Sequence, residues 1–251
     1  MDQQTPKPAL AGSATGAGRL AGVERTARLW SGLVLFAFVL THFLNHALGI
    51  FGIAVMEEAQ LWRIYVWRSS PGTVLLYGAA AIHVLLALKR IVERRTWRMP
   101  LRDIFQICLG LAIPFLLYQH AIGTRWVSEV ANVNDAYGVT LQHLWSNRVW
   151  MQTALTLVVW GHAMIGIEYY LRTKTWWPRW RQAFVVLAIL VPLAALAGYV
   201  AAGREAVVAA HPDARWTVEQ VAAYDTATRF AYNALIVFGI ALIVLLAVRA
   251  L

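Results

Sequence analysis

Charged residues and cysteine are scarce in this chain of 251 residues. Only 14% of the residues are charged and 59% are hydrophobic, whereas a soluble domain carries about a quarter charged residues. So little charge cannot cover a water-facing surface, which excludes an ordinary soluble enzyme and a disordered tail. The single cysteine, Cys108, excludes an intramolecular disulfide, a CxxCH attachment site and a Cys-rich metal site.

A signal peptide is also absent, because the first residues contain no continuous apolar run. We expect a disordered cytoplasmic lead over residues 1–24. What the sequence does contain is six apolar runs, each long enough to cross about 30 Å of hydrocarbon. They cover approximately residues 29–53, 72–92, 104–122, 149–171, 183–203 and 230–248. The sequence therefore predicts an all-α membrane protein with six transmembrane helices.

The net charge of +9 marks orientation rather than a nucleic-acid partner. Of the 22 lysines and arginines, 15 fall in the N-terminal lead, the loops after the second and fourth runs, and the C-terminus. Loops rich in Lys and Arg stay in the cytoplasm. We therefore expect a multi-pass protein of the bacterial inner membrane with both termini cytoplasmic.

Five of the seven histidines lie inside the apolar runs, and they occupy each of the first four: His42, His46, His83, His120 and His162. Ionisable side chains inside a membrane are costly and mark functional sites. At 1.5 Å per residue, they fall at two depths. The outer level holds His42 or His46 with His120, and the inner level holds His83 with His162.

In a four-helix bundle, each level would place two imidazoles on diagonal helices, with room for a flat macrocycle between them. Two imidazoles saturate a haem iron and give a low-spin electron carrier. We therefore predict that the first four transmembrane helices form a bundle over residues 25–175 that binds two haems b. Residues 176–251 would form two further spans with an outer loop. The alternatives are separate helix-packing histidines, and a transmembrane metal site, which would lack carboxylate or cysteine ligands.

Two arginines are placed to meet haem propionates, unless they only reach the membrane surface as snorkelling side chains. Arg90 lies seven residues after His83, at the inner side, and Arg125 lies five residues after His120, at the outer side. His42 and His46 share a helix face. Depth slightly favours His46 as the ligand, and the other histidine of the pair is free to bond a propionate or a quinone oxygen. The two remaining histidines, His143 and His211, are expected at the surface of outer loops.

The Ser31-Gly32 pair, followed ten residues later by His42 and then by His83, His120 and His162, resembles the dihaem cytochrome b anchor of succinate:quinone oxidoreductases and fumarate reductases. The resemblance covers roughly residues 25–175. It implies bis-histidine haems held by His42 with His120 and by His83 with His162, which favours His42 over His46.

The chain differs from that family in its number of spans, because the family has five and this chain has six. A six-span region of this appearance, with a similar Thr-His-Phe-Leu-Asn-His stretch at 41–46, precedes the catalytic domain of some bacterial class III adenylate cyclases. The chain stops soon after Arg249, which suggests an anchor without its cytoplasmic output domain. We expect a redox-sensing or electron-transferring anchor of such a cyclase, forming a homodimer. The alternatives are an anchor subunit of a quinone oxidoreductase, and a haem-free receptor or transporter.

Overall fold

The computed structural model describes residues 16–94, 96–209 and 214–250. His211 and residues 1–15 of the expected lead lie outside these ranges. The described residues form helices and no strand: α1 (Gly16–Ala47), η1 (Leu48–Phe51), α2 (Ile53–Trp67), α3 (Ser70–Val92), α4 (Leu101–Ala121), η2 (Ile122–Trp126), α5 (Val127–Ala131), α6 (Tyr137–Leu171), α7 (Trp177–Ala209) and α8 (Val218–Ala250).

Six of the described helices are long and apolar enough to cross a membrane, which confirms the predicted number. Each extends beyond its apolar run. The first begins at Gly16, so residues 16–24, which were expected to be disordered, form the first turns of α1. The reason is that a helix continues through polar flanks until a breaker or a cap ends it, whereas hydropathy marks only the part that fits the hydrocarbon.

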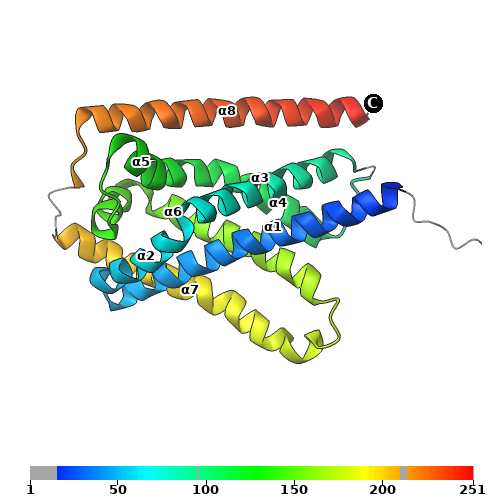
Figure 1. The fold of residues 1–251 in the computed structure, drawn as a ribbon, viewed down its shortest axis with the longest axis horizontal. Helices are drawn as coiled ribbons and strands as arrows, with labels where there is room; N and C mark the ends of the chain where they lie inside the picture. Colours follow the sequence, from blue (N-terminus) through cyan, green and yellow to red (C-terminus); the bar gives the residue numbers. More distant parts are fainter. Residues whose placement is uncertain (1–15, 95, 210–213, 251) are drawn as a thin grey trace, which may run out of the picture.

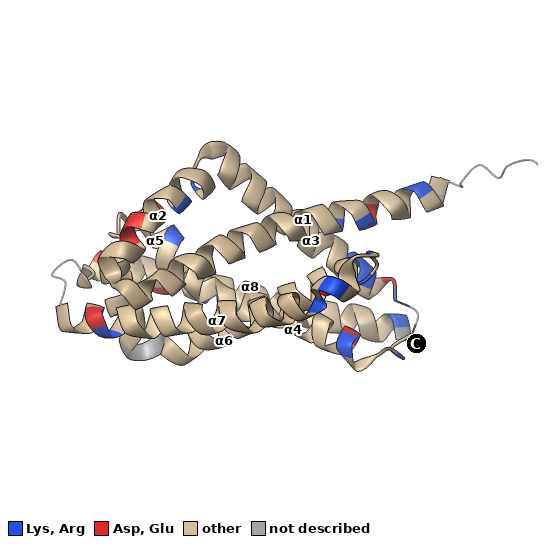
Figure 2. Ribbon diagram, turned by 90° about the horizontal axis from the view of Figure 1, so that it is seen from below, with Lys and Arg blue, Asp and Glu red and all other residues tan. Residues whose placement is uncertain are grey.

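The helices run along one axis, and α1 begins at the end of the molecule where α8 finishes (Figure 1). Most lysines and arginines gather at this end (Figure 2), which we call the basic end. The opposite end, where α1 finishes and α8 begins, is the far end. Clustering of basic residues at one end is the arrangement expected of helices that cross a membrane with a fixed orientation.

The first four spans are arranged as two helix pairs. The helices α1 and α3 pack along each other, as do α4 and α6, and α7 packs against both α1 and α6. The last helix, α8, lies along the side opposite α7 (Figure 1) and packs against α4 and α5. The α1–α3 pair and the α4–α6 pair thus face each other across the middle of the molecule.

Two features fix α7 against the other helices. Glycines at Gly49 and Gly198 let the backbones touch, because a Cβ at Gly198 would lie 2.0 Å from the carbonyl oxygen of His46. Six residues before Gly198, Pro192 has no N–H for the carbonyl of Ala188. The buried Trp160 indole donates to that carbonyl instead, at 2.8 Å.

The helix α2 was not predicted, and it lies between the first two spans at the far end. Its sequence is short and carries Glu57, Glu58 and Arg63 among apolar residues, so it gives no transmembrane signal. Met56 is fully buried against the core of the far end, while Trp62 and Tyr65 are exposed. Aromatic residues on the outer face of such a helix are typical of the membrane interface.

Candidate cofactor site

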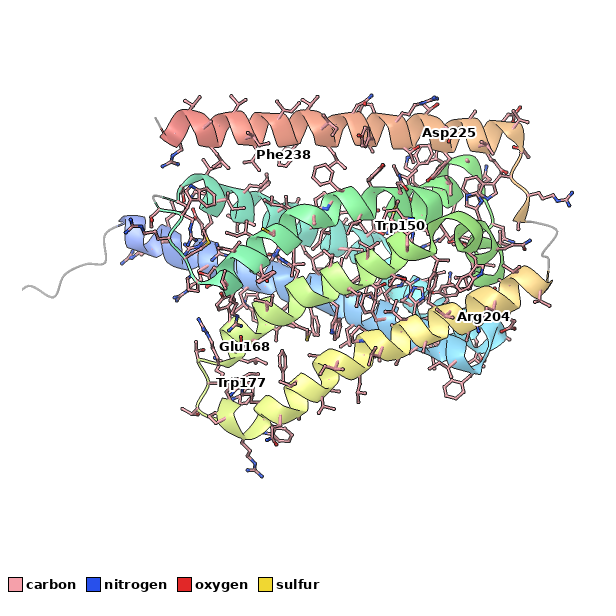
Figure 3. The ribbon with its side chains drawn as sticks, turned by 180° about the vertical axis from the view of Figure 1, so that it is seen from behind. Trp150, Glu168, Trp177, Arg204, Asp225 and Phe238 are labelled. Atoms are coloured by element: carbon pink, nitrogen blue, oxygen red, sulfur yellow. The ribbon has the colours of Figure 1, made fainter. Side chains whose placement is uncertain are left out.

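A large cavity lies between the α1–α3 pair and the α4–α6 pair. Its volume is about 1580 Å³, and all five histidines of the spans line it: His42, His46, His83, His120 and His162. Pockets for small ligands usually hold about 300–1,000 Å³. One side of the cavity is lined by the middle of α8, where Phe238 points toward the four helices (Figure 3). The structure thus brings together the histidines that the sequence singled out.

In the α1–α3 pair, His83 lies against Gly32 of the neighbouring helix. A Cβ added to Gly32 would come within 3.2 Å of the imidazole, so any larger residue there would crowd the ring. The Nδ1 atom of His83 donates to the carbonyl oxygen of Arg28 at 3.3 Å. Because a carbonyl oxygen only accepts, Nδ1 carries the proton and Nε2 keeps its lone pair.

The α4–α6 pair repeats this arrangement. His162 lies against Gly110, where an added Cβ would come within 2.9 Å of the imidazole. Its Nδ1 atom donates to the carbonyl oxygen of Gln106 at 3.1 Å. In both pairs the accepting carbonyl belongs to the residue four positions before the glycine, so the two histidines are held by the same local geometry.

The two histidines face each other across the cavity and form the basic level. The ring centroids of His83 and His162 lie 6.2 Å apart, with the ring planes nearly perpendicular at 87°. No described residue donates a hydrogen bond to either Nε2 atom, and both rings line the cavity. A fixed Nδ1 proton with a free Nε2 is the state in which histidine ligates a metal.

A second level lies ten residues farther along α1 and α4. His42 follows Gly32 by ten residues and His120 follows Gly110 by ten, a separation of about 15 Å along a helix. The ring centroids of His42 and His120 are 5.8 Å apart. The buried side chain of Gln152 accepts from Nδ1 of His120 at 2.9 Å, which again leaves Nε2 unprotonated. We call this the far level.

The far level includes a third imidazole, because His46 lies one turn after His42. Their Nε2 atoms are 3.3 Å apart, so one of the two carries a proton that the other accepts. The His42 ring lies closer to His120, and the His46 ring instead contacts Tyr137 at 5.7 Å and Tyr199 at 6.0 Å between ring centroids. Of the two, His42 is therefore the imidazole that lies beside His120. To ligate through Nε2, His42 would exchange its contact with His46 for the metal.

Arginines line the cavity at both ends. At the basic end they are Arg25, Arg28, Arg90 and Arg94, and at the far end Arg63, Arg68 and Arg125. Arg90, which was expected to meet a propionate, is thus among the residues that line the basic end. Arg125 also lines the cavity, but it is held by an ion pair with Glu129 at 2.7 Å and by a hydrogen bond to Thr73 at 2.9 Å.

Several residues of this site were not found by sequence reasoning. The two glycines that contact His83 and His162 do leave a signal in the sequence, because Gly32-x9-His42 recurs 78 residues later as Gly110-x9-His120. No signal of this kind was available for Gln152 or Arg63. The histidine His143 lies outside the cavity lining, stacked on Trp216 with ring centroids 4.0 Å apart.

Among the described residues, no group of three or more His, Cys, Asp or Glu side chains is arranged to hold a metal ion. The basic level offers two opposed imidazoles, and the far level offers His42 and His120 with His46 beside them.

Comparison of the chain with models of protein families, with curated proteins and with solved structures finds no match. The cavity and its two histidine levels are therefore the basis for assigning a function.

Proposed function

We propose that this protein is a membrane cytochrome of the b type, with one haem at each histidine level, that carries electrons between its two ends. The observation that carries the proposal is the separation of His83 and His162. An imidazole nitrogen lies about 2 Å from a first-row metal that it binds, so two imidazoles on one metal hold their ring centroids about 6 Å apart. The observed 6.2 Å, with both Nδ1 protons fixed on carbonyl oxygens, fits this requirement.

The volume of the cavity supports a bound group. The space measures about 1580 Å³ and is lined by all five histidines of the spans, so it is larger than the usual pocket for a small ligand, about 300–1,000 Å³. Lipid tails could fill such a space, but they offer no partner to five imidazoles.

The roles of the chain follow from the site. A haem between two imidazoles supplies one-electron transfer and has no open position for oxygen. Gln152 and the two carbonyl oxygens orient the imidazoles. The arginines at each end of the cavity offer counter-charges for propionates, and the apolar walls exclude water from the levels.

The decisive measurement is the haem content of the purified protein with its reduced-minus-oxidised spectrum. We expect two haems per chain and a b-type band. Replacing His83 or His162 by alanine should remove one haem and leave the other, and replacing His120 should remove the other one. The matched control is His143→Phe, which keeps an aromatic ring on Trp216 outside the cavity and should leave both haems. A protein without haem would refute the proposal, and unchanged haem content in the His83 and His162 variants would refute the pairing.

The resemblance noted in the sequence leads us to propose further that the cytochrome is a redox-sensing anchor for a cytoplasmic adenylate cyclase, with a quinol as its electron donor. Such coupling requires a free-energy difference between oxidised and reduced states at both ends. The sequence encoded after Leu251 and its neighbouring genes provide the test. A fused cyclase domain supports this proposal, and adjacent flavoprotein and iron–sulfur genes support the anchor subunit of a quinone oxidoreductase instead.

A further inference from the structure

Buried polar atoms without hydrogen-bond partners gather at the far end of the cavity. They include Nε of Arg63 and the hydroxyl of Tyr137, and both residues line the cavity. Tyr137 is 7% exposed. A buried donor that finds no acceptor costs about 1–3 kcal/mol. Two such donors beside one cavity indicate that a ligand supplies the acceptor.

The two donors lie close to each other. Arg63 sits on α2 and Tyr137 begins α6, and the hydroxyl lies beside the Arg63 and Asn45 side chains without a hydrogen bond of ordinary geometry to either. Burial raises the pKa of the Tyr137 hydroxyl, which therefore keeps its proton and can donate. One turn before Arg63, Gln60 has an unpartnered Oε1. That atom is an acceptor, so its natural partner is an N–H of the guanidinium rather than an anion.

The charge of Arg63 is not matched by an acidic side chain. Among the described residues none forms an ion pair with it. Two acidic residues of the far end are engaged elsewhere, since Asp135 pairs with Arg68. Glu57 accepts from the backbone N–H of Gly138 at 3.0 Å. A partly buried cation needs a counter-charge, and the ligand is the remaining source of one.

The helix that carries Arg63 has no counterpart in the α4–α6 pair. The residue that matches His46 at the 78-residue offset is Thr124, whose hydroxyl donates to the backbone carbonyl of His120 at 2.7 Å. The α4–α6 pair has the short η2 and α5 where the α1–α3 pair has α2. The α4–α6 pair thus contributes Tyr137 to the cluster, but it holds His120 and His162 without an equivalent of Arg63.

We propose that Arg63 and Tyr137 form a carboxylate-binding site at the far end of the cavity. Guanidinium and carboxylate groups match in shape and charge, and the Nε and Nη donors of arginine bind the two oxygens side by side. The phenol donates a further hydrogen bond. The carboxylate comes either from a propionate of the far-level haem, in which case the site rests on the proposed function, or from an acid that enters from the far side of the membrane.

The first arm of the test uses the purified, haem-loaded protein and measures the midpoint potential of each haem. We expect Arg63→Gln to lower the potential at the far level and to leave the basic level unchanged, because a positive charge beside the haem favours the reduced state. Arg63→Lys should give a smaller shift and Tyr137→Phe a shift in the same direction. The control is Arg204→Gln, which removes an exposed far-end charge on α7 (Figure 3) and should shift neither potential.

The second arm measures the thermal unfolding of the same proteins with sodium acetate or sodium benzoate, against sodium chloride at equal ionic strength. A free acid as the ligand predicts that the carboxylates raise the unfolding temperature of the wild type and of Arg204→Gln, but not of Arg63→Gln or Tyr137→Phe. Two bound haems, with unmoved potentials and no carboxylate effect, would overturn the site and leave the cytochrome proposal intact. If no haem is present, the second arm alone decides.

Discussion

At the scale of single residues, two glycines control how the basic level is built. His83 and His162 each rest on a helix backbone that has no side chain at that point, at Gly32 and Gly110. The contact fixes the position of the imidazole, and the carbonyl four residues earlier fixes its proton. The glycine and the carbonyl together therefore orient the unprotonated Nε2 atom of each histidine toward the cavity, and no other polar side chain of the described residues takes part.

Gly110→Ala should disturb this contact, because the new methyl group would come within 2.9 Å of the His162 ring. Overpacking of this kind costs about 1–3 kcal/mol, which outweighs the gain of about 1 kcal/mol from replacing a helical glycine by alanine. Chemical unfolding in detergent should show a net loss of stability, and haem content should fall at the basic level. Gly78→Ala, where an added Cβ meets nothing within 4 Å, is the matched control and should be stable with both haems.

The sequence predicts site residues best where a side chain is costly in its surroundings, as an imidazole is inside a membrane. Histidines inside apolar runs have few reasons to be there, so their convergence on one cavity was predictable. The partners of Arg125 were less so, because the helix that holds Arg125 and Glu129 four residues apart lies beyond the apolar run, and its contact with Thr73 comes from a distant part of the chain. Arg63 was not predicted as a site residue because α2, the helix that carries it, was not predicted either.

At the scale of elements, the start of α8 is set by a capping box that lies well before the apolar run of that helix. Thr217 and Gln220 have the residue types and spacing of a capping box, and the structure contains both of its reciprocal bonds, at 3.0 and 3.2 Å. The box stands at the start of the last transmembrane helix. Hydropathy placed the span from about residue 230, and it could not show that the helix starts at Val218.

Gln220→Ala should loosen the far end of α8, because this side chain closes the capping box and also donates to the carbonyl of Ala131 in α5 at 3.1 Å. Loss of a cap costs about 0.5–2 kcal/mol. Hydrogen exchange should speed up in the first turns of α8 and stay unchanged in α6. Gln220→Glu retains the acceptor of the box and removes only the donor to α5, so it should show a smaller effect. Equal exchange in the wild type and Gln220→Ala would contradict this assignment.

The helix α7 depends on a bond from another element. Trp160→Phe removes the donor to the Ala188 carbonyl that Pro192 leaves without a helical partner. Hydrogen bonds between transmembrane helices contribute about 0.6 kcal/mol on average and up to about 1.7. Unfolding experiments should show a loss in the upper part of that range, since the site is buried. Trp150→Phe, at a site 68% exposed (Figure 3), should have no effect above about 0.5 kcal/mol.

At the scale of the whole molecule, charge asymmetry predicts the orientation. In a Cys108→Ala background, single cysteines at Lys174 at the basic end and at Arg215 at the far end should react with a membrane-impermeant maleimide from opposite sides of intact spheroplasts. The far-end cysteine should be labelled in intact spheroplasts and the basic-end cysteine only after lysis, because basic loops remain in the cytoplasm. The reverse pattern would overturn the orientation, and labelling of both from one side would overturn the six-span topology.

The two helix pairs also determine how the cavity would load. Each level takes one histidine from the α1–α3 pair and one from the α4–α6 pair. A haem bound at either level therefore links the same two helix pairs. The first haem to bind restrains the distance and tilt between the two helix pairs. The second haem then binds at a level whose two histidines are already held at the required separation. This is positive cooperativity, and a titration of haem-depleted protein with haemin should give a second association constant larger than the first, after correction for the number of sites.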